Sequence, residues 1–239
     1  MNYIIINAFI FLCGIIGSLL GCLLSFFISP NNKRFLSVSI AFTSGLMLGM
    51  ICFGLIPEAI YSCGDFITIS IIILITLVIL FIELNVEKIK SFNIKNASGF
   101  IILFGIALHN LPEGIAVGSS FVNDRYLGLL IAITIILHDI PEGFVLAVPF
   151  NINMTRKRDT IIYSILAGIP TGIGCIIGTF FGSINNISMG ICMAMAAAAM
   201  LYIIISDLIP EYNRINKGKL PIIANIIGII LGILLMEWK

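Results

Sequence analysis

The chain has 239 residues, of which 59% are hydrophobic and only 10% are charged, and its mean hydropathy is +1.15. Soluble domains carry roughly a quarter of their residues as Asp, Glu, Lys or Arg, so this composition excludes an ordinary soluble protein. The net charge of +1 offers no extended positive field for a nucleic acid or another polyanion, and we expect no nucleic-acid partner.

Eight apolar segments follow one another along the chain. Crossing about 30 Å of hydrocarbon at about 1.5 Å per residue takes about 20 helical residues, and each segment is about that long. The segments are continuously apolar rather than alternating, and an isolated strand would expose its backbone to lipid, so we predict helices. The expected fold is an all-α integral membrane protein with eight transmembrane helices in a single domain, residues 1–239, and with spans near 4–28, 36–60, 66–86, 98–121, 127–149, 160–182, 188–210 and 220–237.

The basic residues predict the orientation in the membrane. Of the 13 Lys and Arg residues, 11 lie in the turns after spans one, three, five and seven, and cytoplasmic turns are the ones enriched in Lys and Arg. Both termini are therefore expected on the extracytoplasmic side. The 11 residues are Lys33, Arg34, Lys88, Lys90, Lys95, Arg156, Lys157, Arg158, Arg214, Lys217 and Lys219.

A short string near the end of span two returns near the end of span seven. Leu-Ile-Pro-Glu occupies residues 55–58 and again residues 208–211. Spans two and seven run in opposite directions in the predicted topology, and so do spans four and five. Matching motifs on oppositely directed spans are typical of an inverted repeat, with the binding site where the halves meet. We predict a 3+2+3 arrangement of spans.

Small residues and cysteines have packing interpretations. Glycines recur every fourth residue at Gly45 and Gly49, at Gly168 and Gly172, and at Gly174, Gly178 and Gly182, which suits close contact between helices. Packing inside the bundle is favoured over a homodimer interface, although both remain open. The six cysteines are scattered in apolar runs without a CxxC pair, so we interpret them as small buried hydrophobic residues rather than as disulfides or metal thiolates.

Two related motifs carry the chemistry. Span four contains His-Asn-Leu-Pro-Glu-Gly at 109–114, and span five contains His-Asp-Ile-Pro-Glu-Gly at 138–143; these hold the only two histidines of the chain. His109 and Glu113 are four residues apart, as are His138 and Glu142, so each pair lies on one helical face where both side chains can reach one ion. The proline inside each motif removes an amide donor and is expected to bend the helix.

Both motifs are predicted at the middle of the bilayer. Each histidine lies about 11 residues into its span, or roughly 16 Å from opposite surfaces. Burying Glu113, Asp139 and Glu142 there without compensation would cost about 8 to 10 kcal/mol on insertion scales. Imidazoles with carboxylates and an amide oxygen suit Zn²⁺, Fe²⁺, Mn²⁺ or Cd²⁺, to which Met47 could add a thioether, whereas Ca²⁺ or Mg²⁺ would need no histidine. A pair of structural hydrogen bonds between helices is the simpler alternative, and the doubled motif disfavours it.

Further acids lie toward both membrane surfaces. Glu58 is expected near the outer mouth, and Glu83, Asp207 and Glu211 near the inner one, so an ion could step from acid to acid. Each of these acids could equally be an ordinary charge at the end of a helix.

At these residues the whole chain resembles the ZIP (Zrt/Irt-like) family of metal-ion transporters, bacterial type. The resemblance implies a transporter and not an enzyme, without a resident cofactor, in a bacterial inner membrane, importing Zn²⁺ or Fe²⁺ through a two-metal centre. One site would take His109, Glu113, His138 and Glu142, with Met47. The other would take Asn110, Asp139 and the two bridging glutamates.

The sequence departs from the family at two places. Many bacterial members have a glutamate in the sixth span where the segment 168–172 places Thr171, which would weaken the second site or change its selectivity. The connection between spans three and four lacks the histidine-rich loop of many relatives.

Three other functions compete. A metal/proton exchanger or an exporter would use the same ligands. An intramembrane metalloprotease is disfavoured because such sites usually show HExxH, which the chain lacks. A metal receptor that does not transport is disfavoured because the acids continue toward both surfaces.

Overall fold

The computed structural model of the chain describes residues 3–27, 32–86, 97–152 and 156–237. These residues form helices joined by short turns, with no strand among them. The α-helices are α1 (Tyr3–Ser25), α2 (Lys33–Met50), α3 (Ile56–Cys63), α4 (Asp65–Val86), α5 (Ala97–Asn123), α6 (Arg125–Ile152), α7 (Lys157–Gly182), α8 (Asn186–Ile203), α9 (Ile209–Ile215) and α10 (Lys219–Glu237). Two π-helical turns, η1 (Ile51–Leu55) and η3 (Ile204–Leu208), join α2 to α3 and α8 to α9.

Every predicted span overlaps one of these helical stretches. Six stretches are long and apolar enough to cross a membrane: Ala8–Ser25, Lys33–Cys63, Arg125–Val148, Lys157–Gly182, Asn186–Ile215 and Lys219–Glu237. Asp65–Phe81 is a shorter apolar helix. The all-helical membrane fold is thereby confirmed, while the count of eight spans in a bilayer stays a prediction.

Local sequence signals set several helix ends. Asn32 caps α2 by accepting a hydrogen bond from the backbone amide of Phe35 at 3.0 Å. Asn185 and Ser188 form a reciprocal capping box at the start of α8, which satisfies amides that have no partner inside the helix. Gly64 separates α3 from α4 with φ +83°, a left-handed conformation that glycine adopts without a steric penalty.

The repeated Leu-Ile-Pro-Glu string coincides with a repeated backbone irregularity. The amide of Ile56, just before Pro57, bonds to the carbonyl of Ile51, and the amide of Ile209, just before Pro210, bonds to that of Ile204. Both bonds reach back five residues, so each proline follows one wide π turn. By contrast, α5 and α6 continue as α-helix through Pro112 and Pro141, so the interruptions of regular helix lie in spans two and seven and not at the histidine motifs.

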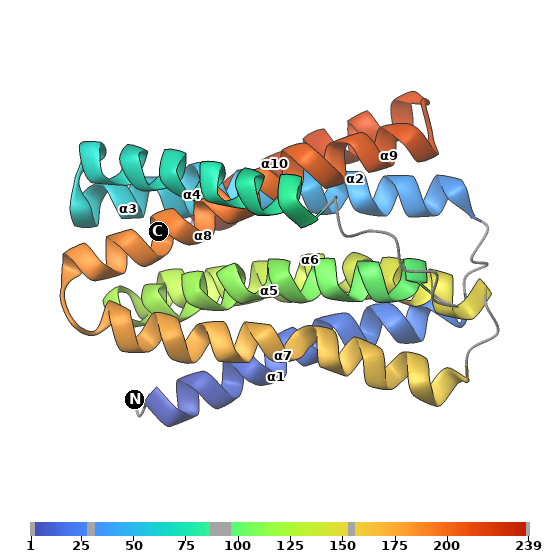
Figure 1. Cartoon of the computed structure of the whole chain (residues 1–239), viewed down its shortest axis with the longest axis horizontal. Coiled ribbons are helices and arrows are strands. Elements are labelled where there is room, and N and C mark those ends of the chain that lie inside the picture. The colour runs from blue at the N-terminus through green and yellow to red at the C-terminus, as the bar shows by residue number, and fades with distance from the viewer. Residues whose placement is uncertain (1–2, 28–31, 87–96, 153–155, 238–239) are drawn as a thin grey trace.

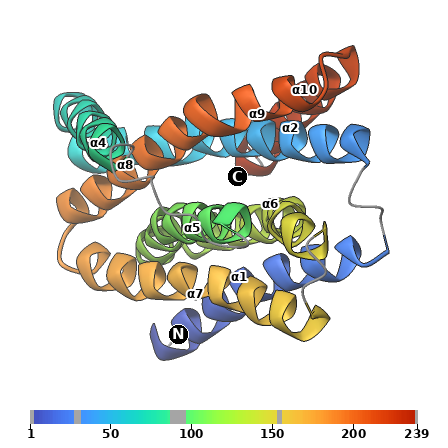
Figure 2. The ribbon, with the colours of Figure 1, turned by 45° about the vertical axis from the view of Figure 1, so that its right-hand side comes forward.

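The helices divide into two groups. In one group, α5 packs along α7, and α1 packs against α6 and α7; in the other, α10 packs along α2, α3 and α4 pack against α8, and α9 packs against α2. Figure 1 shows the two groups as separate layers, and Figure 2 shows the same division after a 45° turn. Contacts of α5 and α7 with α8, and of α6 with α2 and α10, join the layers.

This grouping can be compared with the predicted halves of the chain, spans one to three and spans six to eight. Spans one and six, α1 and α7, lie in the layer of the central pair α5 and α6, whereas spans two, three, seven and eight form the other layer. Each half therefore gives its first helix to one layer and its other two to the second. Such an arrangement is compatible with a 3+2+3 repeat, and the inverted repeat itself stays a prediction.

The three glycine rows pack within the chain. A Cβ atom at Gly45 or Gly49 would meet the backbone of α10, and one at Gly174 or Gly178 would meet the backbone of α5. Gly168 lies against the backbone of α1. The prediction that these glycines bring helices of one bundle together is confirmed, as small residues at interfaces in membranes allow.

The two ends of the molecule differ in their turns. Figure 1 shows the N and C labels at the same end as the α3–α4, α5–α6 and α7–α8 turns, with the starts of α2 and α7 and the α9–α10 turn at the other end. Lys33 and Lys157 open α2 and α7, and Arg214 and Lys219 flank the α9–α10 turn. The fold thus gathers basic residues at the end remote from both termini.

Candidate metal centre

The two histidine motifs lie at the middle of adjacent helices. Asn110 is the fourteenth of the 27 residues of α5, and His138 is the fourteenth of the 28 residues of α6. Because α5 and α6 pack together, their midpoints face each other. The sequence predicted from each span separately that its histidine motif lies at mid-span, and the structure places both motifs at the middle of their helices.

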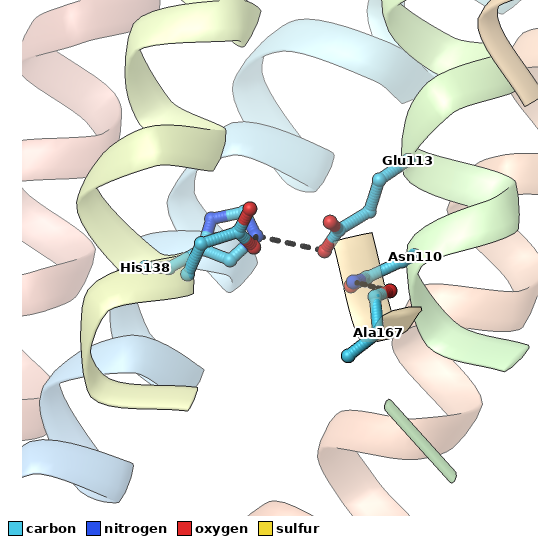
Figure 3. A network of polar contacts seen from close by, with 5 residues as sticks. Asn110, Glu113, His138 and Ala167 are labelled. Atoms are coloured by element: carbon cyan, nitrogen blue, oxygen red, sulfur yellow. Dashed lines mark hydrogen bonds and ion pairs between the residues drawn. The ribbon is translucent and has the colours of Figure 1, made fainter. Parts of the chain in front are cut away.

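Three side chains from the motifs converge. The Nε2 atom of His138 lies 2.8 Å from Oε1 of Glu113 and 3.6 Å from Oδ1 of Asp139, and all three side chains are fully buried. One ligand atom from each of the three lies within 4.8 Å of the others, close enough to hold one metal ion. Figure 3 shows Glu113 reaching from α5 toward His138 on α6.

The chemistry of this cluster suits a cation. Two carboxylates and one imidazole are buried away from water, and the free-energy cost of this desolvation is high unless a positive charge lies among them. In the 2.8 Å contact the imidazole N–H can donate to the carboxylate of Glu113. A divalent ion could replace that proton, because imidazole and carboxylate both bind metals in their deprotonated forms.

Asn110 on α5 and Thr171 on α7 carry buried neutral oxygens. Asn110 is fully buried and its Nδ2 donates to the backbone carbonyl of Ala167 on α7 at 2.8 Å. Its Oδ1 makes no hydrogen bond to the part of the chain that the structure describes. Thr171, one turn further along α7, is also fully buried, and its Oγ1 likewise has no partner there.

The remaining predicted ligands are placed to different degrees. Glu142 lies one turn after His138 on α6 and is only 6% exposed. Met47 is fully buried on α2, in the apolar core that also contains Ile135 of α6. His109 lies on α5, but its side chain is outside the described residues. The assignment of these three as ligands stays a prediction.

The predicted pathway acids lie at the ends of the helical stretches. Glu58 is half-buried in the first turn of α3, and Asp207 is exposed in η3. Glu211 forms an ion pair with Arg214 at 2.8 Å, which offsets part of its charge. The side chain of Glu83 is outside the described residues.

Sequence reasoning missed the carbonyl of Ala167. A backbone oxygen has no letter of its own in a sequence, so only indirect signals could have found it. Pro170 is not such a signal, because a proline leaves without a donor the carbonyl four residues before it, which here belongs to Leu166 and not to Ala167.

A polytopic helical bundle with acids and a histidine buried at the middle of two adjacent helices defines a class, the integral membrane proteins that handle metal ions. Within that class the chain belongs to the ZIP zinc transporter family, whose sequence profile matches residues 84–237. Members of this family are transporters and not enzymes, and the chain is accordingly a multi-pass membrane protein that transports divalent metal.

The chain is similar to bacterial proteins over most of its length. It is 32% identical to the zinc transporter ZupT of Streptococcus mutans, over 91% of this chain and 89% of the relative. It is 30% identical to the zinc transporter ZupT of Clostridium perfringens, over 96% of this chain and 94% of the relative. It is also 30% identical to the zinc transporter ZupT of Chlorobaculum parvum, over 85% of this chain and 86% of the relative. The family and the apolar helices make the chain a multi-pass membrane protein, and its bacterial relatives point to the plasma membrane.

Proposed function

We propose that this protein imports Zn²⁺ into the cytoplasm, and that Fe²⁺, Mn²⁺ and Cd²⁺ can use the same route. The observation that carries the proposal is the buried cluster of Glu113, His138 and Asp139 at the middle of α5 and α6. A mixed nitrogen and oxygen site favours these transition ions over Ca²⁺ and Mg²⁺. The relatives named as zinc transporters support Zn²⁺ as the principal substrate.

The proposed centre comprises six side chains from the two motifs, together with Met47 of α2. Its ligands would be replaced stepwise as the ion moves, since a transported ion must bind firmly enough to enter and loosely enough to leave. Glu58 would attract the ion at the outer mouth, and Asp207 and Glu211, with Glu83, would receive it at the inner one. The six side chains are His109, Asn110, Glu113, His138, Asp139 and Glu142.

The single transport domain would sit in the inner membrane as eight spans with both termini outside. The basic α9–α10 turn and the basic starts of α2 and α7 support this orientation, because Lys and Arg are enriched on the cytoplasmic side. The close packing of the glycine rows within the chain leaves a homodimer without support from these residues.

Uptake into proteoliposomes tests the function. We expect His138→Ala and Glu142→Ala each to lower the initial rate of Zn²⁺ uptake at least about 10-fold, because each removes a ligand of the transported ion. Thr134→Ala is a matched control, since Thr134 is buried on the same helix and its hydroxyl donates to its own helix at Leu130. Uptake by folded His138→Ala and Glu142→Ala protein at the rate of the control would exclude this centre.

The same vesicles distinguish import from exchange. An uncoupled importer should take up Zn²⁺ without an imposed proton gradient. Its uptake rate should not change when a proton gradient of either sign is imposed. A rate that depends on an outward proton gradient would instead indicate the metal/proton exchanger. Setting the membrane voltage with potassium and valinomycin then shows whether the rate of Zn²⁺ uptake also depends on voltage.

A further inference from the structure

Asn110 is bound through one end of its amide only. Its Nδ2 donates to the carbonyl of Ala167 at 2.8 Å, 57 residues away in the sequence, while its Oδ1 has no hydrogen bond to the described part of the chain. The whole side chain is buried. Figure 3 shows Asn110 beside Glu113, with its amide at the carbonyl of Ala167 and both side chains reaching from α5 toward the side of His138.

The orientation of this amide decides whether it can bind a cation. An asparagine presents either an oxygen, which attracts a metal ion, or an NH₂ group, which repels one. If the amide turned over, its oxygen would face the oxygen of Ala167 and both would lack a proton. The contact with α7 therefore leaves the oxygen, and not the NH₂ group, for the interior of the bundle.

The local structure of α7 keeps this carbonyl in place. Ala167 lies within the continuous helix α7, and a backbone carbonyl has two lone pairs, so that of Ala167 can accept from Asn110 in addition to a donor of its own helix. On the other side of the same turn, a Cβ atom at Gly114 of α5 would collide with the carbonyl oxygen of Thr171. The two backbones are thus in contact, and α7 cannot easily withdraw from Asn110.

We infer that the backbone carbonyl of Ala167 acts as the positioning group of the metal centre: it orients Asn110 so that only a neutral amide, and not a carboxylate, works at this position. The inference rests on the proposed function, in which Asn110 is a ligand. It makes Asn110 a determinant of specificity, because the centre receives a neutral oxygen where an acid would otherwise add charge.

The test exploits an order of affinities that a simple ligand would not give. A carboxylate normally binds Zn²⁺ better than an amide, so Asn110→Asp should tighten binding if the oxygen alone matters. With the carbonyl of Ala167 facing it, an aspartate has no proton to donate and one oxygen is repelled. We expect Asn110→Asp to raise the half-saturating Zn²⁺ concentration for uptake roughly 10-fold, as loss of an outer partner of a metal ligand does, and to bind no better than Asn110→Ala.

Asn225 supplies a matched control. Its Nδ2 also donates to a helical carbonyl, that of Ala41 at 3.0 Å, and to Oγ of Ser44 at 2.8 Å, but it joins α10 to α2 in the other layer. Asn225→Asp should lower the yield of folded protein without changing the half-saturating concentration. Equal or tighter binding by folded Asn110→Asp than by the parent protein would overturn the inference, as would an equal weakening by Asn225→Asp.

A measurement on the parent protein avoids dependence on the folding of variants. In the purified full chain, the side-chain amide resonance that Asn110→Ala removes should exchange slowly with solvent, and it should persist when Zn²⁺ is added. Rapid exchange of that resonance, or its disappearance on addition of Zn²⁺, would show that Ala167 does not hold the amide. If His138→Ala left uptake unchanged, the proposed function would fail, whereas these results concern Asn110 alone.

Discussion

Thr171 occupies a tight position at the contact between α7 and α1. A Cβ atom at Gly14 would lie 2.8 Å from the Cβ of Thr171 and 2.9 Å from its Oγ1, so only a glycine leaves room there for the threonine side chain. The hydroxyl is buried and has no hydrogen bond to the described residues. This side chain carries no charge, whereas a glutamate at the same position would carry one.

We predict that Thr171→Glu changes metal preference more than maximal flux. The added carboxylate would raise the attraction for divalent ions and shift the order among Zn²⁺, Cd²⁺ and Mn²⁺, because charge and ligand type decide selectivity. Competition of each ion against radioactive Zn²⁺ in proteoliposomes measures the preference, and the uptake rate at saturation measures the flux. Thr160→Glu is the comparison, since Thr160 lies on the same helix about three turns away. Unchanged preference and unchanged flux in Thr171→Glu would mean that position 171 does not reach the centre.

At the scale of elements, what the sequence could predict depended on how local the cause was. The helices follow from apolar runs of sufficient length, and the facing motifs of α5 and α6 follow from the spacing of His138 and Glu142 and of their counterparts, since a helix repeats every 3.6 residues. The repeat of Leu-Ile-Pro-Glu pointed to spans two and seven. It did not predict the π turns at Ile51–Leu55 and Ile204–Leu208, because one additional residue per turn leaves no mark in an apolar sequence.

Contacts between helices that are distant in the sequence could not be predicted. The hydrogen bond from Asn110 to Ala167 requires α7 to lie against α5, and the room for Thr171 requires Gly14 of α1. Both partners are distant in sequence and one of them is backbone. Pairing of helices in lipid depends on shape rather than on hydrophobic patterning, because the lipid tails are as apolar as the side chains.

The contact of α5 with α7 gives a prediction at this scale. Gly114→Ala would place a methyl group against the carbonyl oxygen of Thr171, and the two backbones would have to separate. We expect a loss of about 1 to 3 kcal/mol in the free energy of unfolding, as for overpacking in a dense core, together with reduced Zn²⁺ uptake. Thermal unfolding of the purified protein in detergent measures the first effect.

Gly218→Ala is the control for this substitution. The three atoms nearest to a Cβ atom there all belong to the side chain of Asn216, the closest at 2.9 Å, and at the exposed α9–α10 turn that side chain can move. We expect its melting temperature to stay within about 2 °C of the parent's, in line with the small effects of surface substitutions. A Gly114→Ala protein as stable as Gly218→Ala would show that α5 and α7 can part without cost.

At the scale of the whole molecule, the candidate ligands are divided unequally between the two layers. The motif residues of α5 and α6 all lie in the layer of α1, α5, α6 and α7, and Met47 alone comes from the other layer. The candidate centre therefore takes its motif ligands from one layer of helices. A movement of this layer relative to the other would keep those ligands together and separate them only from Met47.

The direction of transport requires that the basic end of the molecule face the cytoplasm, and labelling tests this. Ser183 lies in the uncharged, exposed α7–α8 turn, and Gly218 lies in the exposed α9–α10 turn between Lys217 and Lys219. Since positive turns stay in the cytoplasm, a membrane-impermeant maleimide added to intact spheroplasts should label Ser183→Cys and leave Gly218→Cys unlabelled until the membrane is permeabilised. The parent chain, which has six cysteines of its own, sets the background. The opposite labelling pattern would show that the protein has the opposite orientation in the membrane. The acids assigned here to the inner mouth would then receive the ion first.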